Sequence, residues 1–267
     1  MRGQRKFHLP ALAVTVLAVA AIATPVLAQS GLESITSRGT LIAGVKYDTP
    51  PFGYVDQNNQ VVGFDVDLVK EIARALGVKV DLVKVTSPTR IPMLVSGNVD
   101  LVAASMTNTP ERAQTIDFSI TYYTGAQTLL VPDNSSITGP KDLESKTVAV
   151  QQGTTLEKNI AKLAPGAKLL PFRDYTSAWL ALRQGRADAF TGSYDILRGF
   201  AKDAPGYKTV GEKFSLEPFG IGVHKGNTPL LNLVNKVLCD LWSSGKYRDL
   251  YRKWFSVDPD VPLPCGK

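Results

Sequence analysis

Histidine and cysteine are scarce in this sequence, and each shortage excludes a class of function. The 267 residues include two histidines, His8 and His224, and two cysteines. Two imidazoles exclude a multi-histidine metal site and argue against a catalytic triad built on histidine. Two cysteines exclude a small fold that depends on a framework of several disulfides. We therefore expect an ordinary globular protein, which the hydrophobic content of 44% supports.

Runs of basic residues are also absent, which argues against a nucleic-acid partner. The formal net charge is +6, but Arg2, Arg5 and Lys6 contribute half of it, so residues 29–267 carry +3. Without a cluster of Lys and Arg, this modest charge does not form the basic surface that nucleic acids require.

The one apolar run that is long enough to concern a membrane lies near the N-terminus. Basic residues precede an apolar run from Leu9 to Ala28, and the small residues before Gln29 suit cleavage by a signal peptidase. A permanent anchor is the alternative, but the run is slightly short, Ala-rich and interrupted by Pro25, and no cysteine follows it for lipid attachment. We expect residues 1–28 to be a cleaved signal peptide and the protein to be periplasmic.

Export would place Cys239 and Cys265 in an oxidising environment. A disulfide between them would close a loop of about 27 residues and contribute roughly 3–4 kcal/mol of stability in the chain-entropy model. We predict this disulfide, with the role of fixing the C-terminal tail, residues 257–267, to the helix that carries Cys239. A redox-active pair is the alternative.

Apolar patterns in the first half of the chain alternate between strands and helices. Strands are predicted at 40–45, 78–85 and 100–104. A helix is predicted at 65–76, with Asp65 as its N-cap and Gly77 at its end, and a shorter one at 91–95. This alternation is typical of an α/β fold with a parallel sheet.

The same pattern returns after residue 146. Strands are predicted at 147–150, 168–172 and 187–190, and helices at 155–163 and 177–182. Leu94–Leu101 and Leu182–Ala189 share one plan: a helix end, a glycine turn and an aspartate before a strand. Two lobes of similar construction are therefore expected. A strand at 218–223 and helices at 232–242 and 247–255 follow, and the pattern leaves open which lobe they join.

Three short motifs occur in one order and spacing: Gly63–Leu68 (GFDVDL), Thr107–Arg112 (TNTPER) and Gln152–Thr155 (QGTT). Together they resemble the polar amino-acid family of periplasmic solute-binding proteins that serve ABC importers. The resemblance covers nearly all of residues 38–256. It implies an α/β protein with the two-lobed periplasmic-binding-protein (Venus-flytrap) fold, in which each lobe is a sheet flanked by helices.

The resemblance also implies how the chain is divided. Two strand crossings join the lobes, and we place them near 123–128 and 212–219. Lobe one then consists of residues 38–125 and 217–256, and lobe two of residues 126–216. The last strand and the last helices return to lobe one.

A further motif narrows the ligand. Ser87–Pro92 (SPTRIP) resembles the glutamate/aspartate-binding branch, which has an arginine at the position of Arg90 and a basic residue at the position of Lys46. Binders of basic amino acids typically have an aspartate at the latter position. The resemblance therefore implies that an acidic amino acid, L-glutamate or L-aspartate, is handed to a membrane permease. It implies no metal, nucleotide or other cofactor, and we expect a monomer.

The α-carboxylate of such a ligand would be bound from both lobes. Arg112 follows Thr109, which caps a short helix, and its guanidinium can hold a carboxylate through two parallel hydrogen bonds. The backbone N–H of Thr107 and the hydroxyl of Ser105 or Thr107 would complete this contact. The resemblance adds Thr155, at the start of a helix in the other lobe.

Simpler interpretations exist for the same residues. Arg112 could be a surface arginine that pairs with Glu111 or Asp117. Thr154 and Glu157 could form a capping box with no further role, although capping by one residue does not prevent the next from contacting a ligand.

The side-chain carboxylate would meet Lys46 and Arg90, with Ser87 as a further hydrogen-bond donor. Together with Arg112 they place three cations around one cleft, where they repel one another. A ligand with two carboxylates relieves this repulsion, which is a physical reason for selectivity against glutamine. The alternative is that Lys46 and Arg90 are unrelated solvated cations, as most such residues are.

One position departs from the family pattern. The family usually has an aspartate for the ligand's ammonium group where this chain has Ser193, whose hydroxyl carries no charge. Either a neighbour such as Ser105 or a shifted Asp195 holds the amine, or the amine matters less and dicarboxylates without an amine are accepted. Tyr175 stands where a glutamate/aspartate binder can have a histidine.

Two other functions remain open. The ligand could be a neutral or amide amino acid. Some proteins that resemble this family are dehydratases for cyclic, prephenate-like acids, but such catalysis needs a positioned acid or base. No motif of a nucleophile with its base stands out in the sequence, so we expect a binding protein rather than an enzyme.

Overall fold

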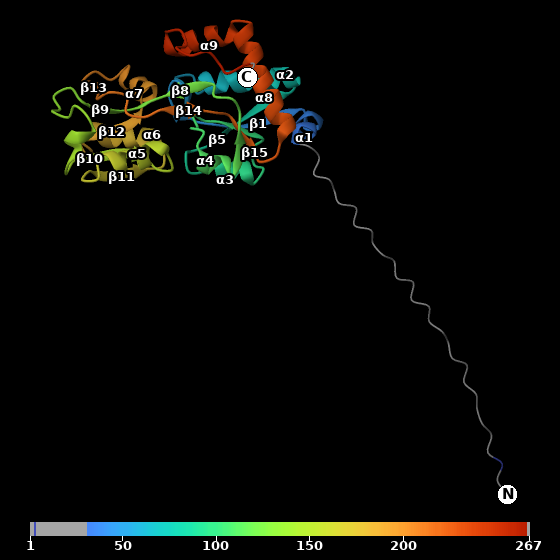
Figure 1. Ribbon diagram of the computed structural model, residues 1–267, viewed down its shortest axis with the longest axis horizontal. Helices are drawn as coiled ribbons and strands as arrows, with labels where there is room; N and C mark the ends of the chain where they lie inside the picture. The colour runs from blue at the N-terminus through green and yellow to red at the C-terminus, as the bar shows by residue number, and fades with distance from the viewer. Residues whose placement is uncertain (1–2, 4–30, 266–267) are drawn as a thin grey trace.

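Two five-stranded sheets organise the chain, each in its own lobe (Figure 1). This computed structural model describes Gly3 and residues 31–265. Apart from Gly3, the predicted signal peptide lies outside the described residues, and it stays a prediction. The two-lobed α/β fold that the sequence predicted is confirmed.

The first sheet has the strand order β5-β1-β6-β15-β7. β1 (Thr40–Val45) lies parallel to β5 (Lys79–Lys84) and to β6 (Leu101–Ala103), as expected for strands joined by helical crossovers. β15 (Gly222–His224) runs antiparallel to β6 and to β7 (Ile116–Phe118). Because β15 comes late in the chain, the polypeptide returns to the first sheet after it has formed the second.

The second sheet has the order β11-β10-β12-β9-β13. β10 (Thr147–Gln151) is parallel to β11 (Lys168–Phe172) and β12 (Ala189–Ser193). β9 (Gln127–Pro132) is antiparallel to both β12 and β13 (Tyr207–Val210). The sequence predicted the three parallel strands but not β9, which is buried over its first five residues and so lacks the two-residue alternation of a half-exposed strand.

Helices pack against both sheets. In the first lobe they are α1 (Gly31–Arg38), α2 (Phe64–Leu76), α3 (Arg90–Val95), α4 (Pro110–Ala113), α8 (Thr228–Ser243) and α9 (Lys246–Phe255). In the second lobe they are η1 (Pro140–Leu143), α5 (Thr155–Leu163), α6 (Tyr175–Arg183) and α7 (Tyr194–Ala201). Every helix that the sequence predicted is present, and the ends differ by at most four residues.

Helix α2 starts at Phe64, so the prediction that Asp65 is its N-cap is wrong. The N-cap is Gly63, with a φ of 142°. A Cβ at this position would lie 2.0 Å from the carbonyl oxygen of Phe52, so the close approach of the two segments requires glycine. Asp65 instead directs its side chain toward the backbone at Ser105.

Two strands cross between the lobes. β8 (Tyr123–Gly125) and β14 (Glu217–Phe219) form an antiparallel pair. The single strand predicted at 218–223 is therefore wrong, because its residues are divided between β14 and β15. Ile221 lies between these strands and bonds to Ser119 in place of β8: its N–H donates to Ser119 Oγ and its carbonyl accepts from the Ser119 N–H, at the point where the chain enters the first sheet.

A small antiparallel sheet follows β1 and consists of β2 (Asp48–Thr49), β3 (Gly53–Val55) and β4 (Val61–Val62). It begins three residues after β1 ends at Val45, with Lys46 in the connection between them. The turn therefore brings Asp48 against the second lobe, where its carboxylate accepts a hydrogen bond from the backbone of Tyr175.

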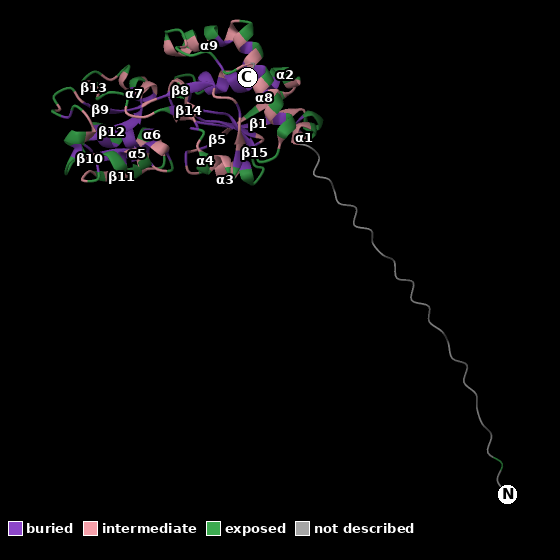
Figure 2. Ribbon diagram, viewed as in Figure 1, coloured by how far each residue is buried: buried purple, intermediate pink, exposed green. Residues whose placement is uncertain are grey.

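The most buried residues follow the sheets and the inner faces of the helices (Figure 2). An aromatic cluster lies behind the crossing strands, with ring centroids 4.8 Å to 5.6 Å apart. Its members are Phe52, Phe64, Tyr123, Phe219 and Phe255. This cluster connects α9 and α2 to both crossing strands, so aromatic contacts join the crossing to the helices of the first lobe.

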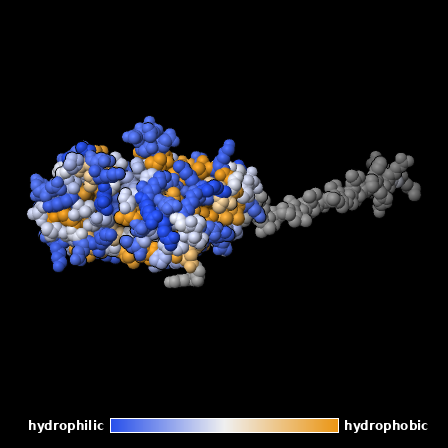
Figure 3. All heavy atoms as spheres, turned by 90° about the horizontal axis from the view of Figure 1, so that it is seen from above, coloured by the Kyte–Doolittle hydropathy of each residue, from blue (hydrophilic) through white to orange (hydrophobic). Residues whose placement is uncertain are grey.

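The predicted disulfide between Cys239 and Cys265 is present, with Cα atoms 5.6 Å apart. It joins α8 to the tail, in which Leu263 is buried. None of the helices in the described part of the chain has the length and apolar character of a membrane span. Seen from above, the surface is largely hydrophilic, with separate hydrophobic areas between charged residues (Figure 3).

Candidate functional site

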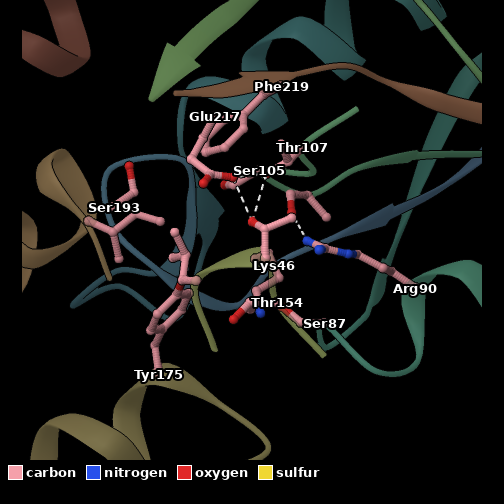
Figure 4. A pocket seen from close by; sticks show the side chains of 14 residues that line it. Lys46, Ser87, Arg90, Ser105, Thr107, Thr154, Tyr175, Ser193, Glu217 and Phe219 are labelled. Atoms are coloured by element: carbon pink, nitrogen blue, oxygen red, sulfur yellow. Dashed lines mark hydrogen bonds between the residues drawn. The ribbon is translucent and has the colours of Figure 1, made fainter. Parts of the chain in front are cut away.

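A small cavity lies where the two lobes meet at the crossing strands (Figure 4). Its volume is about 20 Å³, which is room for about one water molecule. The predicted site residues that line it are Lys46, Ser87, Arg90, Ser105, Thr107, Thr155 and Ser193. Arg112, the remaining predicted residue, lies beside it and donates to the backbone of Thr107.

Direct contacts between the lobes close this cavity. Ser87 Oγ donates to Gln151 Oε1 at 2.9 Å. The backbone N–H of Tyr175 donates to Asp48 Oδ2 at 2.7 Å. The lobes are therefore in a closed arrangement, and part of the hydrogen-bonding capacity of Ser87 is used by the second lobe.

Arg112 joins the two lobes at the rim of the cavity. Thr109 Oγ1 accepts a hydrogen bond from the backbone N–H of Arg112 at 3.2 Å, which confirms the predicted cap of α4. The guanidinium donates through Nη1 to the carbonyl of Thr107 (2.8 Å) and through Nη2 to the carbonyl of Gly153 (3.1 Å). Its positive charge is thus held next to the cavity by one backbone group from each lobe.

The surface pairing considered for Arg112 is wrong. Lys158 Nζ lies 2.7 Å from Glu111 Oε2, and Lys225 Nζ lies 2.7 Å from Asp117 Oδ1. Both carboxylates are therefore paired with lysines, and the guanidinium is left to the backbone contacts at the cavity.

The start of α5 shows that capping and exposure to the cavity occur together. Thr154 Oγ1 accepts from the backbone N–H of Glu157 at 3.1 Å, which confirms the predicted cap. The Glu157 carboxylate accepts from the backbone N–H of Gly153 at 2.8 Å. Thr155, the first residue of the helix, lines the cavity.

Lys46 and Arg90 form a cationic end of the cavity. They are 1% and 3% exposed, so they are not solvated cations. Arg90 Nη1 donates to the carbonyl of Ala104 at 2.8 Å, but its Nε has no hydrogen-bond partner among the described residues. The same holds for Lys46 Nζ, which lies 3.5 Å from Asp48 Oδ1 and 5.4 Å from the centroid of the Tyr175 ring.

Burial makes the charged state of both groups costly. It lowers the pKa of Lys46 to about 8, although the negative charge of Asp48 opposes this change. Burial, assisted by the nearby charge of Arg112, lowers the pKa of Arg90 to about 9. Because the protein stabilises these cations incompletely, an anion at this end would be bound favourably.

Glu217, which sequence reasoning missed, forms the opposite end of the cavity. It is 2% exposed, and its Oε2 accepts hydrogen bonds from Thr107 Oγ1 (2.7 Å) and Thr155 Oγ1 (2.6 Å) (Figure 4). Its Oε1 accepts from Ser215 Oγ (2.8 Å) and Asn159 Nδ2 (3.1 Å). The available signal was a carboxylate within the predicted crossing at 212–219, immediately before an apolar strand.

Asp65, the misassigned helix cap, supports the loop that carries Ser105 and Thr107. Its Oδ2 accepts from the Ser105 N–H at 2.8 Å, and its Oδ1 accepts from the Tyr122 hydroxyl at 2.7 Å. Ser105 has a φ of 46°, a conformation that costs energy for a residue with a side chain. Burial raises the pKa of Asp65 to about 6, although both hydrogen bonds oppose this change.

The residues considered for the ligand's amine differ in their relation to the cavity. Asp195 accepts a hydrogen bond from the Tyr123 hydroxyl on β8 and is not among the residues that line the cavity, so the structure does not support a shifted Asp195 in this role, whereas Ser105 lines the cavity. Ser193 lines the cavity and is fully buried, and its Oγ has no hydrogen-bond partner among the described residues.

Comparison with known proteins assigns the chain to a family. The family model of bacterial extracellular solute-binding proteins, family 3, matches residues 41–257. The chain belongs to this family. A family 3 protein acts outside the cytoplasm, which agrees with the expected export of this chain.

Similar proteins bind several different amino acids. The glutamine-binding protein of an ABC transporter from Bacillus subtilis is 40% identical over 234 residues, which are 85% of either chain. The L-glutamate/L-aspartate-binding protein of Pseudomonas aeruginosa is 29% identical, over 96% of this chain and 89% of that protein. An ancestral arginine-binding protein bound to glutamine has 43% identity and a TM-score of 0.80, over 82% of this chain and 99% of that chain.

These relatives confirm the resemblance to amino-acid-binding proteins of ABC importers. They do not confirm the resemblance to the glutamate/aspartate-binding branch. They are described as binding proteins rather than as enzymes, in agreement with the expected function of this family 3 chain. The glutamate/aspartate binder is, however, less similar in sequence than the relatives named for glutamine or arginine. The identity of the ligand therefore has to be argued from the cavity.

Proposed function

We propose that this protein captures an acidic amino acid, L-glutamate or L-aspartate, outside the cytoplasm and delivers it to the permease of an ABC importer. The observation that carries the proposal is the pair of buried cations, Lys46 and Arg90, each with a nitrogen that lacks a hydrogen-bond partner among the described residues. A side-chain carboxylate would supply the missing acceptors, and it would add a negative charge beside two cations of which Lys46 alone has a carboxylate nearby, that of Asp48 at 3.5 Å.

The same charges argue against the other ligands that relatives bind. The guanidinium of arginine would add a further cation beside Lys46 and Arg90, and neighbouring charges of the same sign repel strongly in a buried site. Glutamine, favoured by the relative from Bacillus subtilis, offers one amide oxygen as an acceptor but no charge. An amide would also direct its NH₂ group at cations, which have no acceptor to offer it.

Binding requires the lobes to separate and close again. The cavity of about 20 Å³ is too small for an amino acid, and the contacts of Ser87 with Gln151 and of Arg112 with Gly153 block access from the side. The two-stranded connection of β8 and β14 is the place where the lobes can hinge. A ligand that contacts both lobes would then favour the closed form, which the permease would recognise.

Calorimetric titration of the purified protein tests this proposal. Glutamate, aspartate, glutamine and arginine are titrated under the same conditions. We expect glutamate or aspartate to bind at least about 30-fold more tightly than glutamine, since a hydrogen-bonded charge contributes more than a neutral group. Equal or tighter binding of glutamine or arginine would overturn the acidic ligand and leave only the family function.

A further inference from the structure

We propose that Glu217, on the crossing strand β14, is the acceptor for the ammonium group of the ligand. It would take the role that the family usually gives to an aspartate at position 193, where this chain has a serine. This inference rests on the proposed function only in requiring an α-amino acid as the ligand, whether its side chain is acidic or an amide.

The first argument concerns which carboxylates are available to a ligand in the cavity. Glu217 is the only acidic residue among the described residues that line the cavity. The other carboxylates nearby are engaged elsewhere: Asp48 with the backbone of the second lobe, Asp65 with the Ser105 loop, and Asp195 with a tyrosine on β8. A ligand ammonium that enters this cavity therefore has one carboxylate available to it.

The second argument is the position of Glu217 next to Ser193. A Cβ built on Gly125 would lie 2.9 Å from Ser193 Oγ and 3.6 Å from the Cβ of Glu217, so both side chains approach the same point on β8. The buried Ser193 hydroxyl has no partner among the described residues and is able to accept a hydrogen bond through either of its two lone pairs. An ammonium between them would obtain a charged acceptor from one residue and a neutral acceptor from the other.

The third argument is that, in the described part of the chain, the hydrogen bonds to Glu217 come from neutral groups. The hydroxyls of Thr107, Thr155 and Ser215 and the amide of Asn159 are its donors. Arg112 makes no hydrogen bond to Glu217 among the described residues and acts on it through its positive charge, while its Nη atoms donate to the carbonyls of Thr107 and Gly153. A hydroxyl can rotate and become an acceptor, so Thr107 and Thr155 can make room for a cationic donor at Glu217 without moving their backbones.

A comparison of ligands with and without the amine tests the assignment. Wild type and Glu217→Gln are titrated with glutamate and with glutarate, its analogue without the amine. The variant should bind glutamate about 10- to 100-fold more weakly and glutarate within about threefold of wild type, because only glutamate presents an ammonium. Equal losses for both ligands would mean that Glu217 only stabilises closure, and the absence of any loss would remove it from the site; either result overturns the proposal.

Two further variants separate the amine contact from effects on folding or the hinge. Asp195→Asn removes a carboxylate that bonds β8 outside the cavity, so it should change both affinities by the same factor. Ser193→Asp, added to Glu217→Gln, should restore the preference for glutamate over glutarate. If Glu217→Gln does not fold, Glu217→Asp is titrated in the same way, since a shorter carboxylate should lower the ratio of the two affinities.

A failure of the Glu217 assignment can be distinguished from a failure of the proposal that the ligand is acidic. If glutamine proves to be the preferred ligand, the same variants are titrated with glutamine and with glutaramate, which lacks the amine. A selective loss for glutamine would keep Glu217 as the ammonium acceptor while the acidic side-chain site is abandoned. Equal losses would overturn the role of Glu217 whatever the side chain of the ligand.

Discussion

The two ends of the cavity differ in how completely their charged groups are bonded. At one end, Glu217 accepts hydrogen bonds from Thr107, Thr155 and two further donors. At the other end, Lys46 Nζ and Arg90 Nε are buried without a hydrogen-bond partner among the described residues. A bonded end contributes to holding the lobes closed, whereas an incompletely bonded end costs free energy until an acceptor arrives.

This difference separates general amino-acid binding from selectivity. The bonded end presents hydroxyls and a carboxylate, which suit the α-carboxylate and α-ammonium that all amino acids share. The cationic end is where the ligand's side chain would lie, and its charges distinguish acidic from other side chains. Substitutions at the two ends should therefore act differently on different ligands.

The largest expected effect is that of Arg90→Met, which keeps most of the side-chain volume and removes the charge. We expect glutamate to bind about 10²- to 10³-fold more weakly, because a buried carboxylate would lose its charged partner, while glutamine loses less than about fivefold. Calorimetric titration of both ligands measures the two losses.

The matched variant at the bonded end is Thr155→Val, which removes a hydroxyl that donates to Glu217. It should weaken glutamate and glutamine by the same factor, about tenfold, because the two ligands do not differ at this end. A loss for Arg90→Met that is the same for both ligands would show that the two ends do not divide affinity from selectivity.

Much of the fold could be predicted because local patterns and the tertiary structure agree. The paired plans Leu94–Leu101 and Leu182–Ala189 each place an aspartate before a central strand, and in the structure Asp100 and Asp188 accept hydrogen bonds from the neighbouring strands β1 and β10. The division of 218–223 into two strands was not predictable, since it depends on Ser119, a residue about 100 positions away.

Site residues that belong to sequence motifs could be predicted. Site residues whose position depends on the pairing of distant strands could not. Arg90 and Thr155 lie in recognisable motifs and Lys46 directly follows the predicted strand at 40–45, and the structure brings all three to one cavity. Glu217 lies in no such motif, and its role depends on the pairing of β14 with β8, which places it between the lobes. Asp65 was misread because the close contact of Gly63 with another segment moves the helix start by one residue.

A further prediction concerns Asp65, which supports the loop at the bonded end, and its variant Asp65→Asn. With its pKa raised from 3.8 to about 6, Asp65 contributes stability that is fully present below about pH 3.8 and is lost as the pH rises through 6. The variant has no titrating group at position 65. Relative to this variant, the free energy of unfolding of the wild type should fall by about 2–3 kcal/mol between pH 4 and pH 7. Denaturant unfolding of both proteins at several pH values measures this, and a constant difference would show that Asp65 does not titrate as a buried acid.

The last prediction, a change of about tenfold, concerns the cationic end and the titration of Lys46. Its pKa of about 8 means that the free protein loses this charge as the pH rises above 8, and a ligand carboxylate needs the charged form. The affinity for glutamate should therefore fall about tenfold between pH 7 and pH 9, relative to glutamine, which shares the α-amine but has no side-chain charge. Lys46→Met should bind glutamate more weakly and without this pH dependence. If its profile were the same as that of the wild type, the titrating group would be another one, and Lys46 would not be in contact with the side chain of the ligand.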